Sequence, residues 1–313
     1  MGVVTSKRPV FTVDQIPDLT GQVTIVTGGN TGIGKETCKA LLEKNAKVYL
    51  AARSKPRADD AIEWLKNETN GKEAVFLELD LGSFASIRKA AEEFKSKEQN
   101  LHVLFNNAGV CYPPIEQKTA DGYDLCFGTN QLGHFYFTRL LLPTLLDTAQ
   151  SVGHARVVHT ASGAVQSAPK GGIVWETLGK DQASFEARKR LGRFPLYAQS
   201  KLANVLFSNE LARRYKDQGI ISIAVDPGII NTEVARHVNL PDWFKNFVMG
   251  LLFHPASKGA LSQLYAGTSP DTTDLNGKWI IPWAAFGEHH PLARDEKLAE
   301  KLWMWCEEHT KEK

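Results

Sequence analysis

Residues Thr27–Thr37 read TGGNTGIGKET, a glycine-rich stretch that follows an apolar run and precedes a helical pattern. Its spacing has two interpretations. Gly29, four further residues, and then Gly34 with a lysine form most of a P-loop, which predicts an NTPase. Gly28, three further residues, and then Gly32 with Gly34 form a turn that is typical of dinucleotide binding. The fold and the chemistry of the chain depend on which interpretation is right.

The residues around the lysine decide against the P-loop. A P-loop needs a Ser or Thr directly after its lysine, because that hydroxyl ligates the magnesium ion. Here Lys35 is followed by Glu36, whose carboxylate would repel the phosphates. Thr37 comes one residue late, which rotates its side chain by about 100° around a helix. We therefore expect a dinucleotide, with its pyrophosphate close to the glycines and to the N-terminus of the following helix.

Short β-branched runs alternate along the chain with longer helical patterns. This alternation predicts parallel strands joined by crossover helices that cover both faces of a sheet. The early strands are almost wholly apolar, as expected when both faces are buried. We predict an α/β fold with a doubly wound, Rossmann-type parallel sheet. The predicted strands are 23–27, 46–51, 74–79, 101–105, 155–160, 220–225 and 278–282, and the predicted helices cover 32–44, 59–67, 84–96, 129–146 and 197–215.

The 313 residues suit a single large domain. We predict an N-terminal arm over residues 1–20 and one dinucleotide-binding catalytic domain over 21–313. Two segments, 163–195 and 227–255, look like insertions on the substrate side of that domain. The second of them is rich in large apolar side chains.

Composition narrows the classes of partner. The formal net charge is +2 with both signs interspersed, which predicts no nucleic-acid partner, since that requires a concentrated basic face. The four cysteines form no Cys-x-x-Cys pair, so we expect neither a metal site nor a disulfide framework, and a reducing compartment.

The N-terminus bears on location. No apolar run is long enough to span a bilayer, and no signal peptide is apparent, so we expect a cytoplasmic protein. MGVVTSKR nevertheless matches a myristoylation pattern at Gly2, which would add a weak membrane association. A frayed N-terminal arm is the alternative interpretation.

Five further motifs follow in chain order, each beside a predicted strand or helix. They are NNAG at 106–109, TNQLGHF at 129–135, VVHTASG at 157–163, YAQSK at 197–201 and DPGIINT at 226–232. Together with the glycine-rich turn, this set resembles the short-chain dehydrogenase/reductase family over about residues 22–269. The stretches GNTGIGKET, NQLGHF and SKLANVLF are most similar to its retinol-dehydrogenase-like and fungal carbonyl-reductase-like branches.

The resemblance implies a catalytic set of Asn130, Ser162, Tyr197 and Lys201. Tyr197 and Lys201 are four positions apart, so on a helix both side chains face the same way. The ammonium and an oxidised nicotinamide would lower the pKa of the tyrosine, which would then act as general acid in reduction and general base in oxidation. Ser162 would donate to the substrate oxygen.

The resemblance also implies that Lys201 holds the nicotinamide ribose and that Asn130 helps hold a water that links Lys201 to solvent. The assignment of Ser162 depends on register, because Thr160 and Ser167 lie near it in sequence.

The residues after the second predicted strand indicate NADP(H). An NAD enzyme usually places a carboxylate there for the ribose 2′-OH, whereas this chain has Arg53, with Lys55 and Arg57 close behind. Arginine pairs with a 2′-phosphate, while Lys55 and Arg57 could instead be solvated loop charges. Asp80 is expected to bond the adenine amino group, as in relatives. The predicted cofactor contacts are Gly28, Asn30, Thr31, Gly32, Ile33, Gly34, Arg53, Asp80, Leu81, Asn107, Ala108, Gly109, Tyr197, Lys201, Pro227, Gly228, Ile230 and Thr232.

Apolar side chains in both insertions predict a small apolar carbonyl or alcohol substrate. Trp175, Leu178, Phe185, Leu191 and Phe194 would wall its site, and the alternative is that they pack the core or a dimer interface. A homodimer stays open, since many relatives associate through their long helices. A non-catalytic NADP(H)-sensing regulator is the rival function, although such a protein would usually have lost Tyr197 or Lys201.

Overall fold

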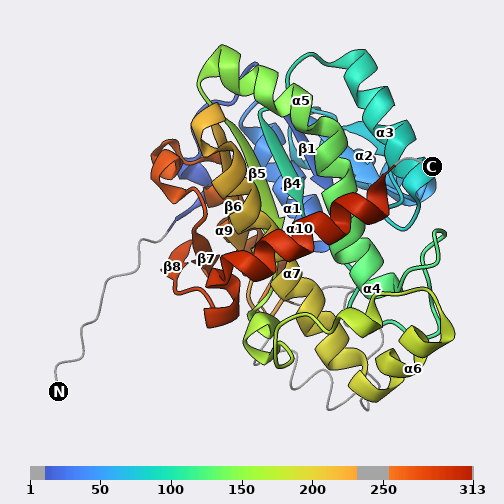
Figure 1. Cartoon of the computed structure of the whole chain (residues 1–313). Helices are drawn as coiled ribbons and strands as arrows, with labels where there is room; N and C mark the ends of the chain where they lie inside the picture. Colours follow the sequence, from blue (N-terminus) through green and yellow to red (C-terminus); the bar gives the residue numbers. More distant parts are fainter. Residues whose placement is uncertain (1–10, 231–253, 312–313) are drawn as a thin grey trace.

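The central sheet has the strand order of a doubly wound fold. The structure is a computed structural model, and it describes residues 11–230 and 254–311. Eight strands lie in the order β3-β2-β1-β4-β5-β6-β7-β8 (Figure 1). Neighbours from β3 to β7 pair in parallel, and β8 pairs antiparallel with β7. The strands are β1 Val23–Thr27, β2 Lys47–Ala52, β3 Val75–Glu78, β4 Val103–Asn106, β5 Ala155–Thr160, β6 Ile220–Val225, β7 Trp279–Ile281 and β8 Ala285–Gly287.

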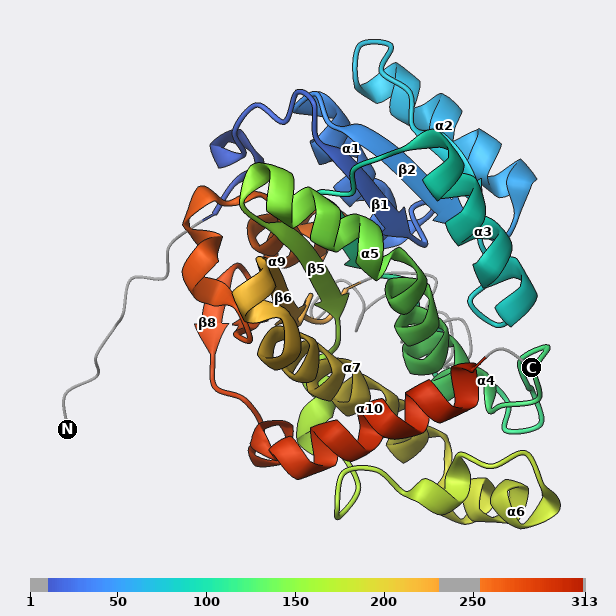
Figure 2. The ribbon, with the colours of Figure 1, turned by 45° about the horizontal axis from the view of Figure 1, so that its top comes forward.

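Helices cover both faces of this sheet, as Figures 1 and 2 show from two directions. One buried apolar cluster joins the sheet to α3, α5 and α7, and a second joins it to α1, α2 and α9. Every residue of β1, β5 and β6 is buried as a result. The helices are α1 Gly32–Glu43, α2 Lys55–Glu68, α3 Phe84–Lys97, α4 Leu125–Phe127, α5 His134–Val152, α6 Gln182–Leu191, α7 Arg193–Tyr215, α9 Ala256–Thr268 and α10 Glu296–Thr310.

The predicted fold class is confirmed, and two helices differ in detail from the prediction. The helix expected over 129–146 is a π-helical segment, η2 Gly128–Gly133, followed by α5, which runs on to Val152. Helix α7 begins at Arg193 rather than at Tyr197, and its first turn tolerates Pro195 because the first N–H groups of a helix lack intrahelical partners.

Five helices and strands were not predicted from the sequence: α4, α6, α9, α10 and β8. The last of these helices, α10, crosses the outer faces of α5 and α7 (Figures 1 and 2). Trp303 anchors it, with its ring 5.1 Å from that of Phe135 in α5 and 5.8 Å from that of Phe207 in α7. The Arg214 guanidinium lies over the same indole at 4.7 Å. This packing makes α10 part of the core.

The segment 163–195 forms short 3₁₀ helices, η3 Gly163–Ser167 and η4 Trp175–Thr177, followed by α6 and the start of α7. The buried Arg188 of α6 holds this segment together, because its guanidinium donates to the carbonyl oxygens of Thr177 and Gly179 over 2.8 and 2.9 Å.

The part of the predicted N-terminal arm that the structure describes, residues 11–20, packs against the domain. Phe11, Ile16 and Leu19 are buried in the cluster that includes α1 and α9, so these residues belong to the core rather than to a separate arm. Gly2 lies outside the described residues, and its acylation stays a prediction. Within the described ranges, no helix combines the length and apolar character that crossing a membrane requires.

Candidate functional site

The glycine-rich turn after β1 brings backbone close to backbone. Gly28 has a φ of 67°, a left-handed conformation that glycine adopts without strain. A Cβ on Gly34 would overlap the carbonyl oxygen of Gly28 and would lie 2.6 Å from Nδ2 of Asn107. The first turn of α1 therefore lies against the ends of β1 and β4, where its free N–H groups are available to an anion. The strand order reverses at these two strands, which is where doubly wound folds bind nucleotides.

Thr27, the last residue of β1, joins this turn to β4 and α5. Its hydroxyl oxygen accepts the backbone N–H groups of Asn107 and Ala108, each over 2.9 Å. Nε2 of the buried His134 lies 2.9 Å from the same oxygen, and Nδ1 lies 3.0 Å from the carbonyl oxygen of Asn130. Burial lowers the pKa of His134 to about 4, so the ring is neutral at pH 7. Because a carbonyl only accepts, Nδ1 carries the proton and Nε2 is the acceptor.

Lys35 and Thr37 do not occupy the positions that a P-loop requires. Nζ of Lys35 lies 3.8 Å above the ring of Trp64 in α2. The buried hydroxyl of Thr37 donates to the carbonyl oxygen of Ile33 over 2.8 Å and accepts from Gln263. Both side chains are thus turned away from the glycines, which agrees with the rejection of the NTPase interpretation.

Three of the four predicted catalytic residues meet where α7 passes the end of β5. The side chain of Ser162 lies near the Tyr197 hydroxyl and acts to lower its pKa. Lys201, one turn further along α7, is buried, and its Nζ donates to the carbonyl oxygen of Thr160 over 2.8 Å. That nitrogen lies 5.9 Å from the centre of the Tyr197 ring. The Thr160 hydroxyl instead donates to Gln263 over 2.8 Å, so the register favours Ser162 as the partner of Tyr197.

Asn130, in η2, connects this group to the loop after β4. Its Oδ1 accepts the N–H of Val110 over 2.8 Å, and its Nδ2 lies 3.0 Å from both the carbonyl oxygen of Val110 and Oγ of Ser200. Its own carbonyl oxygen accepts from Nδ2 of Asn204 over 2.7 Å, in addition to His134. Asn130 thus ties the π-helical segment to α7 on one side and to the loop after β4 on the other. The water-holding role implied by the resemblance stays a prediction.

Comparisons with known proteins agree with this geometry. The family model described as short chain dehydrogenase matches residues 22–177. A short-chain dehydrogenase/reductase of Armillaria gallica is 51% identical over 300 residues, which cover 96% of this chain and 94% of that protein. The chain is a short-chain dehydrogenase/reductase.

Two further comparisons support its placement in this family. Retinol dehydrogenase 12 of Homo sapiens is 38% identical to the chain over 299 residues, covering 92% of this chain and 86% of that protein. A solved structure of an uncharacterized protein from Mycobacterium paratuberculosis superposes with a TM-score of 0.73 at 28% identity, covering 96% of this chain and 97% of that one. The chain therefore belongs to the retinol-dehydrogenase-like branch, and enzymes of its family use a nicotinamide cofactor.

Burial dominates the pKa values of the two α7 residues in this short-chain dehydrogenase/reductase. It raises the pKa of Tyr197 well above its ordinary value, and the side chain of Ser162 opposes that rise. It lowers the pKa of Lys201 to about 8. The lowered pKa predicted from the sequence depends on an oxidised nicotinamide beside Tyr197 as well as on the ammonium, so it stays a prediction. In the chain alone, burial and the nearby Cys111 both raise the pKa of Tyr197.

Asp226, at the end of β6, joins two loops of the site. Its Oδ1 accepts the N–H of Gly228 over 2.9 Å, and the carboxylate also accepts the N–H of Gly163, next to Ser162. Its negative charge raises the pKa of Lys201, against the effect of burial. Asp226 belongs to the motif DPGIINT, in which the sequence indicated no role for this position.

The residues predicted for the adenosine side lie at the ends of β2 and β3. Arg53 follows β2 directly, its side chain is exposed, and within the described part of the chain it makes no ion pair. Lys55 is part of α2 and pairs with Asp59 over 2.7 Å. Oδ1 of Asp80 accepts the N–H of Gly82 over 2.8 Å. Of Arg53 and Lys55, only Lys55 is thus engaged in an ion pair among the described residues.

The remaining predicted cofactor residues follow the ends of the parallel strands or lie outside the residues that the structure describes. Asn30, Thr31, Gly32 and Ile33 form the turn and the first residues of α1, Leu81 follows Asp80 after β3, Gly109 follows Ala108 after β4, and Pro227 follows β6. Ile230 is buried and pairs with His254 in an isolated bridge. Thr232 and most of the segment 227–255 lie outside the described residues, so their predicted roles are not addressed by the structure.

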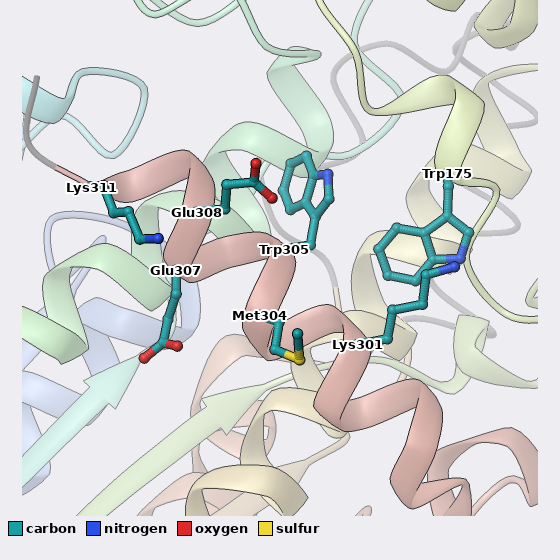
Figure 3. Close-up of a pocket in the computed structure, with 7 residues that line it drawn as sticks. All are labelled: Trp175, Lys301, Met304, Trp305, Glu307, Glu308 and Lys311. Atoms are coloured by element: carbon teal, nitrogen blue, oxygen red, sulfur yellow. The ribbon is translucent and has the colours of Figure 1, made fainter.

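The aromatic residues expected to wall the substrate site are dispersed. Trp175 lines a hollow of about 440 Å³ along α10 together with Met304 and Trp305 (Figure 3), and none of the predicted site residues lines it. Leu178 is buried in the core. Phe194, in contrast, lies close to the site, because its ring is 5.9 Å from that of Tyr112, which contacts Tyr197.

Sequence reasoning missed four residues of this site: His134, Asp226, Cys111 and Tyr112. The first two lie inside motifs that were recognised for other positions. The last two follow NNAG after one intervening residue, Val110, and no pattern marks them. Only the folded chain shows that His134 reaches Thr27, or that Tyr112 reaches Tyr197.

Proposed function

We propose that this chain is an NADP(H)-dependent oxidoreductase that transfers a hydride between the nicotinamide and a fairly hydrophobic carbonyl or alcohol. The observation that carries the proposal is the placement of Ser162 beside Tyr197, with the buried amino group of Lys201 one turn away. A bound nicotinamide would supply the hydride chemistry. The chain supplies binding, orientation and a proton.

The residues at the switch point fit such a dinucleotide. The close approach of Gly34 to Gly28 leaves no room for side chains where the pyrophosphate would lie, and the N-terminus of α1 favours its negative charge. Asp80 and Asn107–Gly109 would line the adenosine side. Lys201 would hold the nicotinamide ribose, and Pro227–Ile230 with Thr232 would lie on the nicotinamide side.

Tyr197 and Ser162 would act on the oxygen of the substrate. In reduction, Tyr197 gives its phenolic proton to the developing alkoxide, and in oxidation it takes the proton of the alcohol. Ser162 donates a hydrogen bond to the same oxygen as negative charge develops there. Lys201 stabilises the phenolate that remains, and Asn130 positions this group through its bonds to β4 and α7.

The preference for NADP(H) is supported by Arg53. Strand β2 ends in Ala51 and Ala52, which offer no carboxylate to the ribose, and an exposed guanidinium follows directly. A guanidinium forms paired hydrogen bonds to phosphate oxygens. The carboxylate that NAD-dependent enzymes place here would instead repel the 2′-phosphate.

An apolar substrate is supported by the aromatic residues Tyr112 and Phe194 beside Tyr197. Retinol dehydrogenase 12, a relative at 38% identity, is named for an apolar alcohol. The rival function, a non-catalytic NADP(H) sensor, receives no such support, since Tyr197, Lys201 and Ser162 are all present and in contact with their expected neighbours.

The test is consumption of NADPH with a panel of apolar aldehydes and ketones, run in parallel with NADH. We expect turnover with NADPH, weaker turnover with NADH, and a loss of about 10²–10⁴-fold in Tyr197→Phe. Tyr215→Phe is the matched control. It also removes a tyrosine hydroxyl from α7, but that hydroxyl accepts a hydrogen bond from Arg139 and is not part of the proposed catalytic set. Turnover that survives in Tyr197→Phe would overturn the assigned roles, and a preference for NADH would overturn the role of Arg53.

A further inference from the structure

Tyr112 has a backbone conformation that its side chain does not favour. Its φ is 52°, in the left-handed region where bulky residues are uncommon outliers. Such conformations persist only where the surrounding structure holds them, and they concentrate at functional sites. The neighbouring Val110 supplies the restraint, since both its N–H and its carbonyl oxygen are bonded to the side chain of Asn130.

This conformation places the Tyr112 ring against Tyr197. The two ring centres are 5.0 Å apart with an interplanar angle of 66°, an edge-to-face contact. Cys111 lies beside the same two rings, because the side chains of Tyr112 and Tyr197 both act to lower the pKa of its thiol against the effect of burial. Thus the strained residue is held next to the proposed acid rather than in the core.

A second aromatic residue, Phe194, contacts Tyr112 from a different part of the chain. It lies in the first turn of α7, three positions before Tyr197, and its ring is 5.9 Å from that of Tyr112. Its side chain is 47% exposed, and Tyr112 is half-buried. Two aromatic rings thus border solvent beside the hydroxyl that would meet the substrate.

We infer that Tyr112 and Phe194 are specificity-determining residues that select flat aromatic or conjugated carbonyl compounds and alcohols over saturated compounds of the same skeleton. The inference rests on the proposed function for the position of the substrate oxygen. Aromatic rings attract other π systems in stacked and edge-to-face arrangements, beyond the gain from burying apolar area alone. A saturated ring offers the same bulk without that attraction.

A matched substrate pair tests the inference. The ratio of kcat/KM for 2-naphthaldehyde to that for decahydro-2-naphthaldehyde is measured with NADPH in the wild type and in variants. The two aldehydes differ in intrinsic reactivity, but that difference is common to all variants. We expect Tyr112→Leu to lower the ratio by about 3- to 10-fold, Phe194→Leu to lower it less, and Tyr112→Phe to keep it.

Phe286→Leu is the control, because Phe286 is similarly exposed at 55% but lies in β8, where its ring neighbour is Tyr265. A ratio that is unchanged in Tyr112→Leu, with NADPH bound as tightly as in the wild type, would overturn the inference.

A binding experiment separates this inference from the proposed function. The two corresponding alcohols, 2-naphthylmethanol and its decahydro form, are titrated calorimetrically into Tyr197→Phe and into Tyr197→Phe with Tyr112→Leu. A preference for the aromatic alcohol that is lost in the double variant supports the inference even if the wild type reduces neither aldehyde, in which case only the proposed function fails. Equal affinity for the two alcohols in both proteins would overturn the inference, whatever the wild type reduces.

Discussion

Nε2 of His134 lies 2.9 Å from Oγ1 of Thr27, although the two residues are 107 positions apart in the sequence. The other ring nitrogen contacts the carbonyl oxygen of Asn130. One neutral imidazole therefore couples the turn that would bind the dinucleotide to the segment that holds the proposed catalytic residues. Replacing His134 should therefore change both the binding of the dinucleotide and the rate of catalysis.

We expect His134→Leu to raise the KM for NADPH by about 10-fold, or ~1.4 kcal/mol, and to lower kcat as well. It also removes one hydrogen bond each from the Thr27 hydroxyl and the Asn130 carbonyl, which keep their other partners, at a cost of about 0.5–1.5 kcal/mol per bond in the free energy of unfolding. His159→Leu is the control: His159 is equally buried but bonds Ser222 in the sheet. Loss of stability without a change in KM for NADPH in both variants would contradict the coupling.

The pH dependence of reduction should follow Lys201. Burial lowers the pKa of its ammonium to about 8, so the positive charge is present below pH 8 and is lost as the pH rises through that value. Because the proposed mechanism needs this charge, kcat/KM for NADPH is expected to fall above about pH 8. Asp226→Asn removes a negative charge that raises the Lys201 pKa, so the fall should move to lower pH.

The control for this profile is Asp217→Asn, an exposed carboxylate next to the opposite end of β6. Its profile should match that of the wild type. If Asp226→Asn also left the profile in place, Asp226 would have only a structural role in the loops.

Arg53→Ala should weaken the binding of NADPH but not that of NADH. Losing a charged hydrogen bond to phosphate is expected to raise the KM for NADPH by about 10-fold or more, while the KM for NADH changes little. Lys55→Ala serves as comparison, since Lys55 is already paired with Asp59. An equal loss with both cofactors would show that Arg53 does not contact the 2′-phosphate.

Trp303→Ala should destabilise the fold without touching the site. Replacing a buried Trp by Ala typically removes about 3–5 kcal/mol from the free energy of unfolding. Met304→Ala, the adjacent position with a side chain that is 60% exposed, should change it by less than about 0.5 kcal/mol. Urea unfolding followed by tryptophan fluorescence and by circular dichroism measures both. Similar midpoints for the two variants would show that α10 does not support the core.

The sheet and the glycine-rich turn were predictable because their determinants are local. The strand Val23–Thr27 is wholly apolar or small because helices cover both faces of the sheet. The glycines after it are required because the first turn of α1 lies directly against the end of the strand. Tyr197, Lys201, Ser162 and Asn130 were predictable by resemblance. Parallel topology explains why the structure brings them together, since strands β4, β5 and β6 end at one edge.

Other features depend on long-range contacts that no sequence period records. The π-helical segment around Asn130 is stabilised by Val110 and Asn204 from elsewhere in the chain. Strand β8 is three residues long and exists by pairing with β7. The conformation of Tyr112 is set by its surroundings against its own preference. Each is a case in which tertiary structure overrides local propensity.

Helix α10 occupies the outer faces of α5 and α7 with the chain's own C-terminal segment. A second subunit could use those faces only by displacing the indole of Trp303 from its contacts with Phe135 and Phe207. A homodimer of this protein would therefore have to form on another surface. Proteolytic cleavage before α10 would expose the apolar faces of α5 and α7. Samples in which α10 has been removed should therefore aggregate, whereas samples with α10 intact should not.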